Sequence, residues 1–247
     1  MTELYELREK VALSCRILAM TGLVDEITGH VSVRIPNSND MLIRCRGEHE
    51  EGLPYTEAEA VRRVDFEGSS QDLEGIYDVP LEHPIHGQIY RMRPEVQCVI
   101  HAHPPASLMC GITELELKPV FGAYDPSAMQ IALEGIPVFP RSILVSNPEI
   151  AHSMLEAMGD KRVCLMRGHG ITVTGSSIED ATVRAIRVEK LARIIWEISQ
   201  AGKEPQAISS EDVEAFQNRS GKRGLPRADE WTWRYYVRKL NERNNRS

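Results

Sequence analysis

The sequence predicts a single α/β domain, and three observations lead to this prediction. The chain has 247 residues with a hydrophobic content of 42%, which is enough to bury one sizeable core. It shows no linker or internal repeat that would divide it. Segments with apolar residues at every third or fourth position are mixed with short apolar runs, a pattern typical of helices and strands in one domain.

The first part of the chain predicts a helix followed by a pair of strands. Apolar side chains recur at helical spacing over 4–18, and Gly22 can end that helix. The alternation over 31–35 and the apolar run over 41–43 predict two strands joined by the polar turn 36–40.

The middle of the chain predicts a strand over 61–66, a helix over 84–92 and a strand at Cys98-Val99-Ile100. Arg93-Pro94 would stop the helix, because proline cannot continue it. The helical side chains expected to face inward are Ile85, Ile89 and Met92.

Further helices and strands are expected in the second half. Helix starts are predicted at 104–106, 146–149 and 177–180, and strands over 136–140 and 163–166. The helix that starts at Ser177 keeps apolar residues at steps of three and four up to Ile195, and Gly202 and Pro205 can end it.

The tail over 203–247 differs from the rest. It is mostly polar up to residue 230 and then has four of the fourteen aromatic residues within 231–236. Aromatic side chains have large apolar surfaces that are usually buried against other residues. We therefore expect this tail to pack on its own domain or on a neighbouring subunit.

Composition narrows the possible partners and compartments. A net charge of −7 disfavours general nucleic-acid binding, which relies on clustered Lys and Arg. We expect no membrane span and no signal peptide, and so a soluble, cytoplasmic protein. Five cysteines without a CxxC pair are expected to be reduced core residues: Cys15, Cys45, Cys98, Cys110 and Cys164.

Three histidines in two segments are the main functional signal. His101 and His103 follow an apolar run, and residues two apart on a strand point to the same face. His169 follows a second apolar run and lies between Gly168 and Gly170, which allow a sharp turn. Three imidazoles can hold a catalytic divalent metal and leave positions open for substrate.

A glutamate completes a pattern that resembles the class II aldolase/adducin family. Glu82 lies nineteen residues before His101, and His169 lies sixty-six residues after His103. The segment Gly29-His30-Val31-Ser32 is similar to a turn near the start of family members. The resemblance covers roughly residues 5–200, and it implies a domain over 1–202 with the family's α/β/α sandwich and a central, mainly antiparallel sheet.

The resemblance also implies roles for these residues. His101, His103 and His169 would bind the metal, which could be Zn, Mn, Fe or Co, and Glu82 would be the catalytic acid or base and could also touch the metal. From the residues alone, Glu82 at a predicted helix start could instead be an N-terminal cap carboxylate. A buried His86, one turn from Glu82, could line the site or bond to backbone.

The chain departs from the sugar-phosphate aldolases of the family. His30 stands where they carry Asn, 44–48 replaces their Thr-Gly pair, and 79–81 replaces the Ser-Ser pair before Glu82. Arg46 suits a planar carboxylate, because a guanidinium can bind it with two parallel hydrogen bonds. By composition alone, Arg46 could also pair with the nearby acids Glu48, Glu50 or Glu51.

With these segments, the chain is similar to the hydroxy-aromatic carboxylate decarboxylases of the family, a branch that includes the dihydroxyphthalate and the hydroxymethylpyridine-dicarboxylate decarboxylases. This implies a metal-dependent lyase of aromatic catabolism that acts on a small carboxylate. Its substrate-binding residues would be His30, Ser32, Arg46 and Gly47. Three alternatives stay open: a sugar-phosphate aldolase, an iron-dependent oxygenase, and a non-catalytic scaffold like the adducin head.

Family members of this kind are typically tetramers with sites at subunit interfaces. The resemblance therefore implies a homotetramer in which a tail tyrosine, Tyr235 or Tyr236, reaches a neighbouring site as proton donor.

Overall fold

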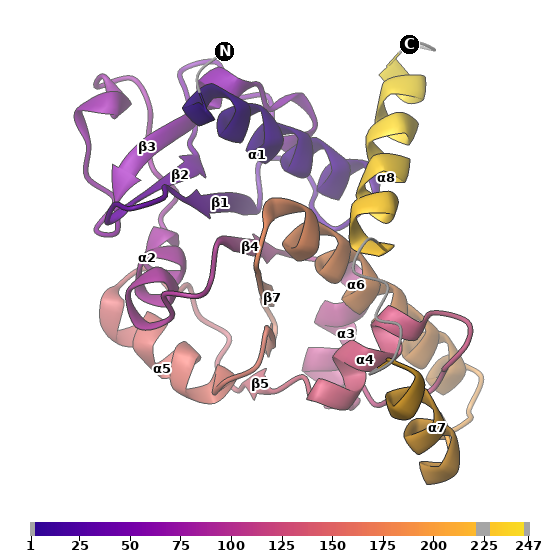
Figure 1. Ribbon diagram of the computed structural model, residues 1–247. Helices are drawn as coiled ribbons and strands as arrows, with labels where there is room; N and C mark the ends of the chain where they lie inside the picture. The colour runs from indigo at the N-terminus through magenta and orange to yellow at the C-terminus, as the bar shows by residue number, and fades with distance from the viewer. Residues whose placement is uncertain (1–2, 221–227, 245–247) are drawn as a thin grey trace.

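A computed structural model describes residues 3–220 and 228–244 (Figure 1). Its helices are α1 (Glu3–Met20), α2 (His83–Met92), α3 (Pro105–Thr113), α4 (Pro126–Glu134), α5 (Pro148–Met158), α6 (Ile178–Gln200), α7 (Ser210–Ser220) and α8 (Ala228–Asn244). Short 3-10 helices cover Leu53–Tyr55, Ala58–Ala60 and Gln71–Leu73.

One seven-stranded sheet forms the centre of the described chain. Its strands are β1 (His30–Arg34), β2 (Asp40–Arg44), β3 (Val61–Asp65), β4 (Cys98–Ala102), β5 (Val138–Phe139), β6 (Val163–Met166) and β7 (Gly170–Gly175). They lie in the order β3-β2-β1-β4-β7-β6-β5. Every pair is antiparallel except β5 and β6, which are parallel. The predicted mainly antiparallel α/β architecture is confirmed.

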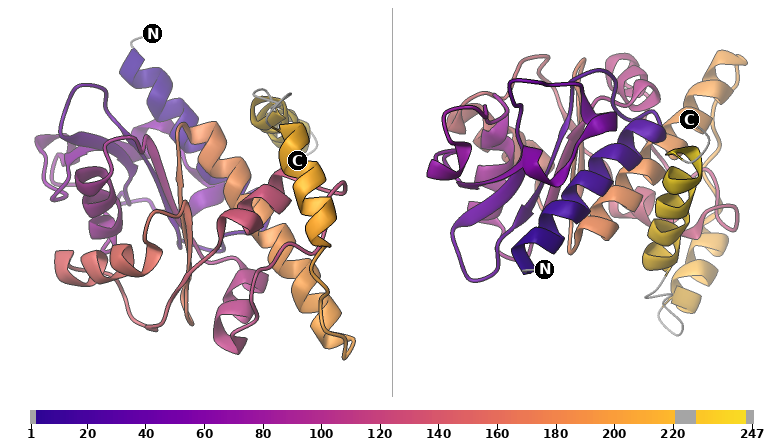
Figure 2. Two further views of the ribbon diagram at one scale, coloured as in Figure 1. Left: turned by 60° about the horizontal axis from the view of Figure 1, so that its bottom comes forward. Right: turned by 90° about the horizontal axis from the view of Figure 1, so that it is seen from above.

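Helices cover both faces of this sheet, as Figures 1 and 2 show. On one face, α2 and α5 pack over a core that includes Ile85, Val99 and Met154. On the other face, α1, α3 and α6 pack over a larger core that includes Leu18, Ile100 and Val188. The helix α8 packs against α1 and α6, outside this second layer.

Alternation of side chains along β1 and β4 decides which residues reach each face. Val31 and Ile100 point into the core under α1 and α6. Val99, one residue away, points into the core under α2 and α5. By the same alternation, His30 and His101 lie on the face of the sheet that α2 covers. The side chains of the candidate site lie on this face.

Most of the predicted elements are present, and the differences have physical reasons. The apolar pattern did not predict β7, because a central strand buried on both faces shows no alternation. It also missed α4, α7 and α8. Met92 was expected to face inward, which is wrong: it lies at the last residue of α2 and is 49% exposed.

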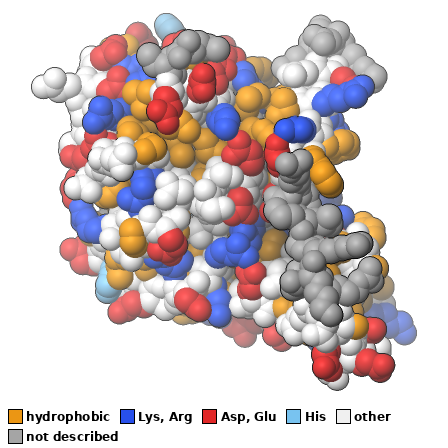
Figure 3. Space-filling model, in the orientation of Figure 1, with side chains coloured by type: hydrophobic (Ala, Val, Ile, Leu, Met, Phe, Trp, Pro, Cys, Tyr) orange, Lys and Arg blue, Asp and Glu red, His pale blue; other side chains and the backbone are white. Residues whose placement is uncertain are grey.

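None of the described helices is both long and apolar enough to cross a membrane. All five cysteines are buried and unbridged, as expected. Figure 3 shows basic and acidic side chains interspersed over the described residues of one face, with an apolar area between them.

Candidate metal and active site

The ends of β4 and β7 bring the three histidines together. His101 is the fourth residue of β4, and His103 follows the strand directly. His169 precedes β7, which pairs with β4 so that Ala102 lies opposite Ile171. This close approach requires glycine at position 170, because a Cβ there would lie 2.2 Å from the carbonyl oxygen of Ala102.

The ligand atoms of Glu82, His101, His103 and His169 all lie within 4.8 Å of one another. The Nε2 atoms of His101 and His103 are 2.9 Å apart. Glu82 Oε2 lies 3.4 Å from His101 Nε2 and 3.2 Å from His169 Nε2. The structure therefore directs three imidazole nitrogens and one carboxylate oxygen at one point.

Glu82 does not act as a helix cap, although it occupies the first position before α2. Its side chain makes no capping hydrogen bond. Instead, Oε1 accepts a hydrogen bond of 2.8 Å from the backbone N–H of Val145, and Oε2 faces the histidines. The cap interpretation is wrong, because the carboxylate points away from the helix end and into the cluster.

The donor set fits a divalent metal. Burial lowers the pKa of His101, and burial together with the neighbouring His101 and His169 lowers the pKa of His103 to about 3. These rings are therefore neutral near pH 7, as metal ligands must be. His169 Nε2 is buried without a hydrogen-bond partner, which leaves a lone pair available for an ion.

Glu82 is ionised in this setting. Burial opposes its charged form, but the neighbouring His101 and His169 bring its pKa well below its ordinary value. A carboxylate and three imidazoles match the ligand preferences of several transition metals.

A second set of polar side chains lies beside the cluster, inside the face covered by α2. His30 pairs with His101 across β1 and β4, and their ring centroids are 5.1 Å apart. His30 Nδ1 lies 2.6 Å from His86 Nε2, and His86 Nδ1 lies 2.6 Å from Ser32 Oγ. Ser32 Oγ lies 2.7 Å from the hydroxyl of Tyr90. This set is buried and hydrogen bonded throughout.

The sequence prediction for this second set was incomplete. His86 is fully buried, but its partners are the side chains of His30 and Ser32, not backbone. The residue patterns that mark the site in the sequence do not include Tyr90. The available signal was the spacing of Glu82, His86 and Tyr90, four residues apart near one face of a helix. Ser32, expected to bind substrate, is fully buried behind His86.

Arg46 and Gly47 follow β2 in a loop that pairs with Asp78. Arg46 Nη2 donates a hydrogen bond of 3.2 Å to the carbonyl oxygen of Ile27. The expected alternative partners are not used: Glu50 pairs with Arg44. Within the described ranges, no ion pair joins Arg46 to an acid, so its charge stays available for an anion.

Tyr235 and Tyr236 do not approach the histidine cluster of their own chain. They lie on α8, which packs outside α6, whereas Glu82 starts α2 on the other face of the sheet. Tyr235 is 57% exposed, and its ring centroid is 5.1 Å from that of Tyr236.

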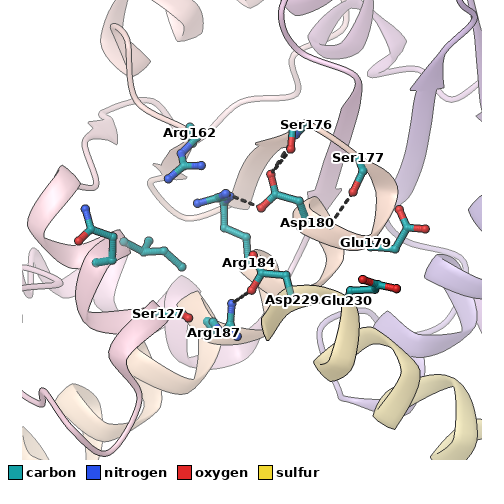
Figure 4. Close-up of a pocket in the computed structure, with 12 residues that line it drawn as sticks. Ser127, Arg162, Ser176, Ser177, Glu179, Asp180, Arg184, Arg187, Asp229 and Glu230 are labelled. Atoms are coloured by element: carbon teal, nitrogen blue, oxygen red, sulfur yellow. Dashed lines mark hydrogen bonds and ion pairs between the residues drawn. The ribbon is translucent and has the colours of Figure 1, made fainter. Parts of the chain in front are cut away.

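A separate pocket of about 430 Å³ lies between α4, α6 and α8, away from the histidines. Figure 4 shows Arg184 reaching Asp180 and Arg187 reaching Asp229 across it. Arg162, also in its wall, pairs with Glu134. Because these arginines are paired with acids, the pocket offers fewer free groups for binding or catalysis than the histidine cluster does.

Comparison with known proteins identifies the family. The sequence profile of the Class II Aldolase and Adducin N-terminal domain matches residues 9–196. The chain belongs to the class II aldolase and adducin family. This confirms the resemblance seen in the spacing of Glu82, His101 and His169.

Relatives within the family also agree with the resemblance to its decarboxylases. The 3,4-dihydroxyphthalate decarboxylase of Arthrobacter keyseri is 39% identical over 95% of this chain and 94% of its own. The enzyme of the same name from Terrabacter sp. (strain DBF63) is 41% identical, over 85% of this chain and 88% of its own.

A solved structure supports the fold. The aldolase II superfamily protein from Pseudomonas syringae superimposes with a TM-score of 0.82, at 21% identity, over 98% of this chain and 94% of that chain.

Proposed function

We propose that this chain is a divalent-metal-dependent lyase that removes CO2 from a hydroxy-aromatic dicarboxylate of the dihydroxyphthalate type. The observation that carries the proposal is the identity of 39% and 41% to two 3,4-dihydroxyphthalate decarboxylases over most of the chain. The histidine cluster alone fits an aldolase equally well, because both reactions need an electron sink.

His101, His103 and His169 would hold the metal, with Glu82 as a fourth ligand or as a neighbouring base. When bound, the metal would polarise substrate oxygens and stabilise the negative charge left after C–C cleavage. The site would offer three histidine nitrogens, one carboxylate from Glu82 and no thiolate. This ligand set leaves Zn, Mn, Fe and Co as candidates.

The substrate is anionic, and Arg46 and His30 supply the matching groups. The guanidinium of Arg46, which forms no ion pair with a described residue, suits a carboxylate, and His30 lies next to His101. Exposed apolar side chains flank Glu82 on two segments: Leu81 is 68% exposed and Leu144 is 57% exposed. They would contact the ring of an aromatic substrate, whereas a sugar phosphate would offer them little apolar area.

In the proposed reaction, the group that protonates the ring carbon differs from the groups that bind the metal. The bond between the ring carbon and the leaving carboxylate breaks, CO2 departs, and the ring carbon takes up one proton. The pKa of Glu82, brought well below its ordinary value by His101 and His169 despite burial, makes its carboxylate a poor acid. We therefore assign protonation to a hydroxyl, with Tyr235 or Tyr236 of a neighbouring subunit as candidates.

This assignment requires an oligomer. Because α8 lies outside α6, its tyrosines would reach a histidine cluster only in another subunit. We propose the homotetramer and the cytoplasmic location expected for such a catabolic enzyme on the same basis.

The test uses protein loaded in turn with Zn²⁺, Mn²⁺, Fe²⁺ and Co²⁺. It is incubated with ortho-hydroxy aromatic and pyridine dicarboxylates, and in parallel with sugar phosphates, while CO2 release, O2 uptake and product mass are followed. CO2 from an aromatic acid, abolished in His101→Ala, is the expected result. Carbonyl fragments from a sugar phosphate without CO2 would favour the aldolase, and O2 consumption would favour the oxygenase.

A further inference from the structure

The hydrogen-bonded chain that runs from Tyr90 through Ser32 and His86 to His30 is wholly inside the protein. Ser32 and His86 are fully buried, Tyr90 is 1% exposed, and His30 is 4% exposed. The three distances along the chain are 2.7, 2.6 and 2.6 Å. A buried network of this kind is stable only when every member has a defined donor or acceptor role.

The direction of the chain follows from its inner end. Tyr90 is 1% exposed, and a phenol buried in this way needs an acceptor for its O–H proton. The acceptor left for the phenol proton among the described residues is Ser32 Oγ. Tyr90 therefore donates to Ser32.

Each following link is then determined. The Ser32 hydroxyl donates its own proton to His86 Nδ1. A ring nitrogen that accepts a hydrogen bond carries no proton, so a ring with an accepting Nδ1 is a neutral imidazole with its single N–H on Nε2. With its Nδ1 accepting, His86 carries the proton on Nε2 and donates it to His30 Nδ1. His30 must carry its proton on Nε2.

His30 Nε2 is the free end of the chain. No hydrogen bond joins it to another described residue, and it is not among the fully buried unpaired polar atoms. The ring stands beside His101, one of the candidate metal ligands. An N–H at this place would meet an oxygen of a molecule bound at the cluster.

We propose that Tyr90, Ser32 and His86 are positioning residues that hold His30 as its Nε2–H tautomer, so that His30 donates a hydrogen bond to a carboxylate oxygen of the substrate. The identity of the acceptor rests on the proposed function, whereas the tautomer does not. Without the chain, a neutral His30 would populate both tautomers, and part of the molecules would present a lone pair that repels an anionic oxygen.

The test is a nitrogen NMR measurement on the Zn²⁺-loaded protein labelled with ¹⁵N in histidine. His30 is assigned by loss of its signals in His30→Ala. We expect a pyrrole-type Nε2 and a pyridine-type Nδ1 in the wild type. In Ser32→Ala and in Tyr90→Phe, both His30 signals should move toward averaged values, while Tyr55→Phe, at a tyrosine that is 66% exposed, should leave them unchanged.

A second measurement tests the donor role without turnover. Phthalate, a non-hydroxylated dicarboxylate, should shift the Nε2–H signal, and its Kd by calorimetry should weaken by about tenfold or more in His30→Ala. Zinc content and far-UV circular dichroism of each variant establish that the site and fold are retained.

Several outcomes would overturn the inference. A pyridine-type Nε2 in the wild type would contradict the assigned tautomer, and unchanged signals in both Ser32→Ala and Tyr90→Phe would remove the positioning role. An Nε2–H signal insensitive to phthalate would remove the donor role. If the tautomer and phthalate results are as expected but no acid is decarboxylated, the proposed function fails while the role of the chain stands.

Discussion

Glu82 and Val145 are joined by a hydrogen bond of 2.8 Å, in which the carboxylate accepts from a backbone N–H sixty-three residues away. One oxygen of Glu82 is thereby anchored to the segment before α5, and the other is turned to His101 and His169. The carboxylate of Glu82 thus has one orientation before any ligand binds, which is what a metal or proton-transfer site requires.

Substitution of Glu82 by Gln should separate charge from shape. The amide oxygen can still accept a hydrogen bond from the Val145 N–H, but the substitution removes the negative charge beside the histidines. We expect decarboxylation to fall by about 100-fold or more, in the range seen for loss of a general base. Initial rates of CO2 release measure this. Glu156→Gln, at a carboxylate that is 69% exposed on α5, is the matched control and should keep the wild-type rate.

Removal of a histidine should remove metal. His101→Ala and His169→Ala each delete one converging nitrogen, and we expect bound Zn²⁺ after dialysis to fall by about tenfold or more. Elemental analysis gives the metal content. His152→Ala, on the exposed side of α5, should bind as much Zn²⁺ as the wild type. Equal zinc in all three variants would exclude this cluster as the metal site.

The metal-free protein should lose stability in acid below about pH 6.5. The folded-state pKa of His103 is lowered to about 3 by burial and by its neighbours, from an ordinary value of 6.5. Between these values the unfolded chain binds a proton that the folded chain does not, so stability falls as pH falls. Burial lowers the pKa of His30 and His86 as well, which adds to the effect.

Urea unfolding of EDTA-treated protein at pH 7.5 and pH 5.0 measures this acid dependence. If the urea concentration at the midpoint is no lower at pH 5.0 than at pH 7.5, the histidines are not held neutral in the folded state.

Glu189 on α6 should be important for stability, because it caps a helix other than its own. Its carboxylate is 4% exposed and accepts hydrogen bonds from the backbone N–H groups of Ala106 and Ser107 and from the Ser107 hydroxyl, at the start of α3. Glu189→Ala would leave these donors buried and unpaired, at a cost of about 3 kcal/mol in the free energy of unfolding.

Chemical unfolding of the metal-loaded protein measures this free energy. Glu197→Ala, an exposed position on the same helix, should change it by less than about 0.5 kcal/mol. Because α3 begins two residues after His103, Glu189→Ala should also weaken zinc binding, and unchanged zinc binding would limit Glu189 to a role in folding.

Several features could be predicted from local sequence. Apolar periodicity located α1, α2, α5 and α6, because each buries one face against the sheet. The spacing of Glu82, His101, His103 and His169 selected the four residues that the structure brings within 4.8 Å. Periodicity failed for α8, whose sequence is mostly polar, and for β7, which is buried on both faces.

The sequence by itself determined the fold class, the family and the four residues of the candidate metal site, because these depend on residue type and on spacing along the chain. Only the tertiary structure decided how the carboxylate and imidazoles are oriented. Glu82 is turned by Val145, and His30 is held by a chain that ends at Tyr90. Hydrogen bonds between residues more than fifty positions apart depend on strand pairing and helix packing, and no local pattern records them.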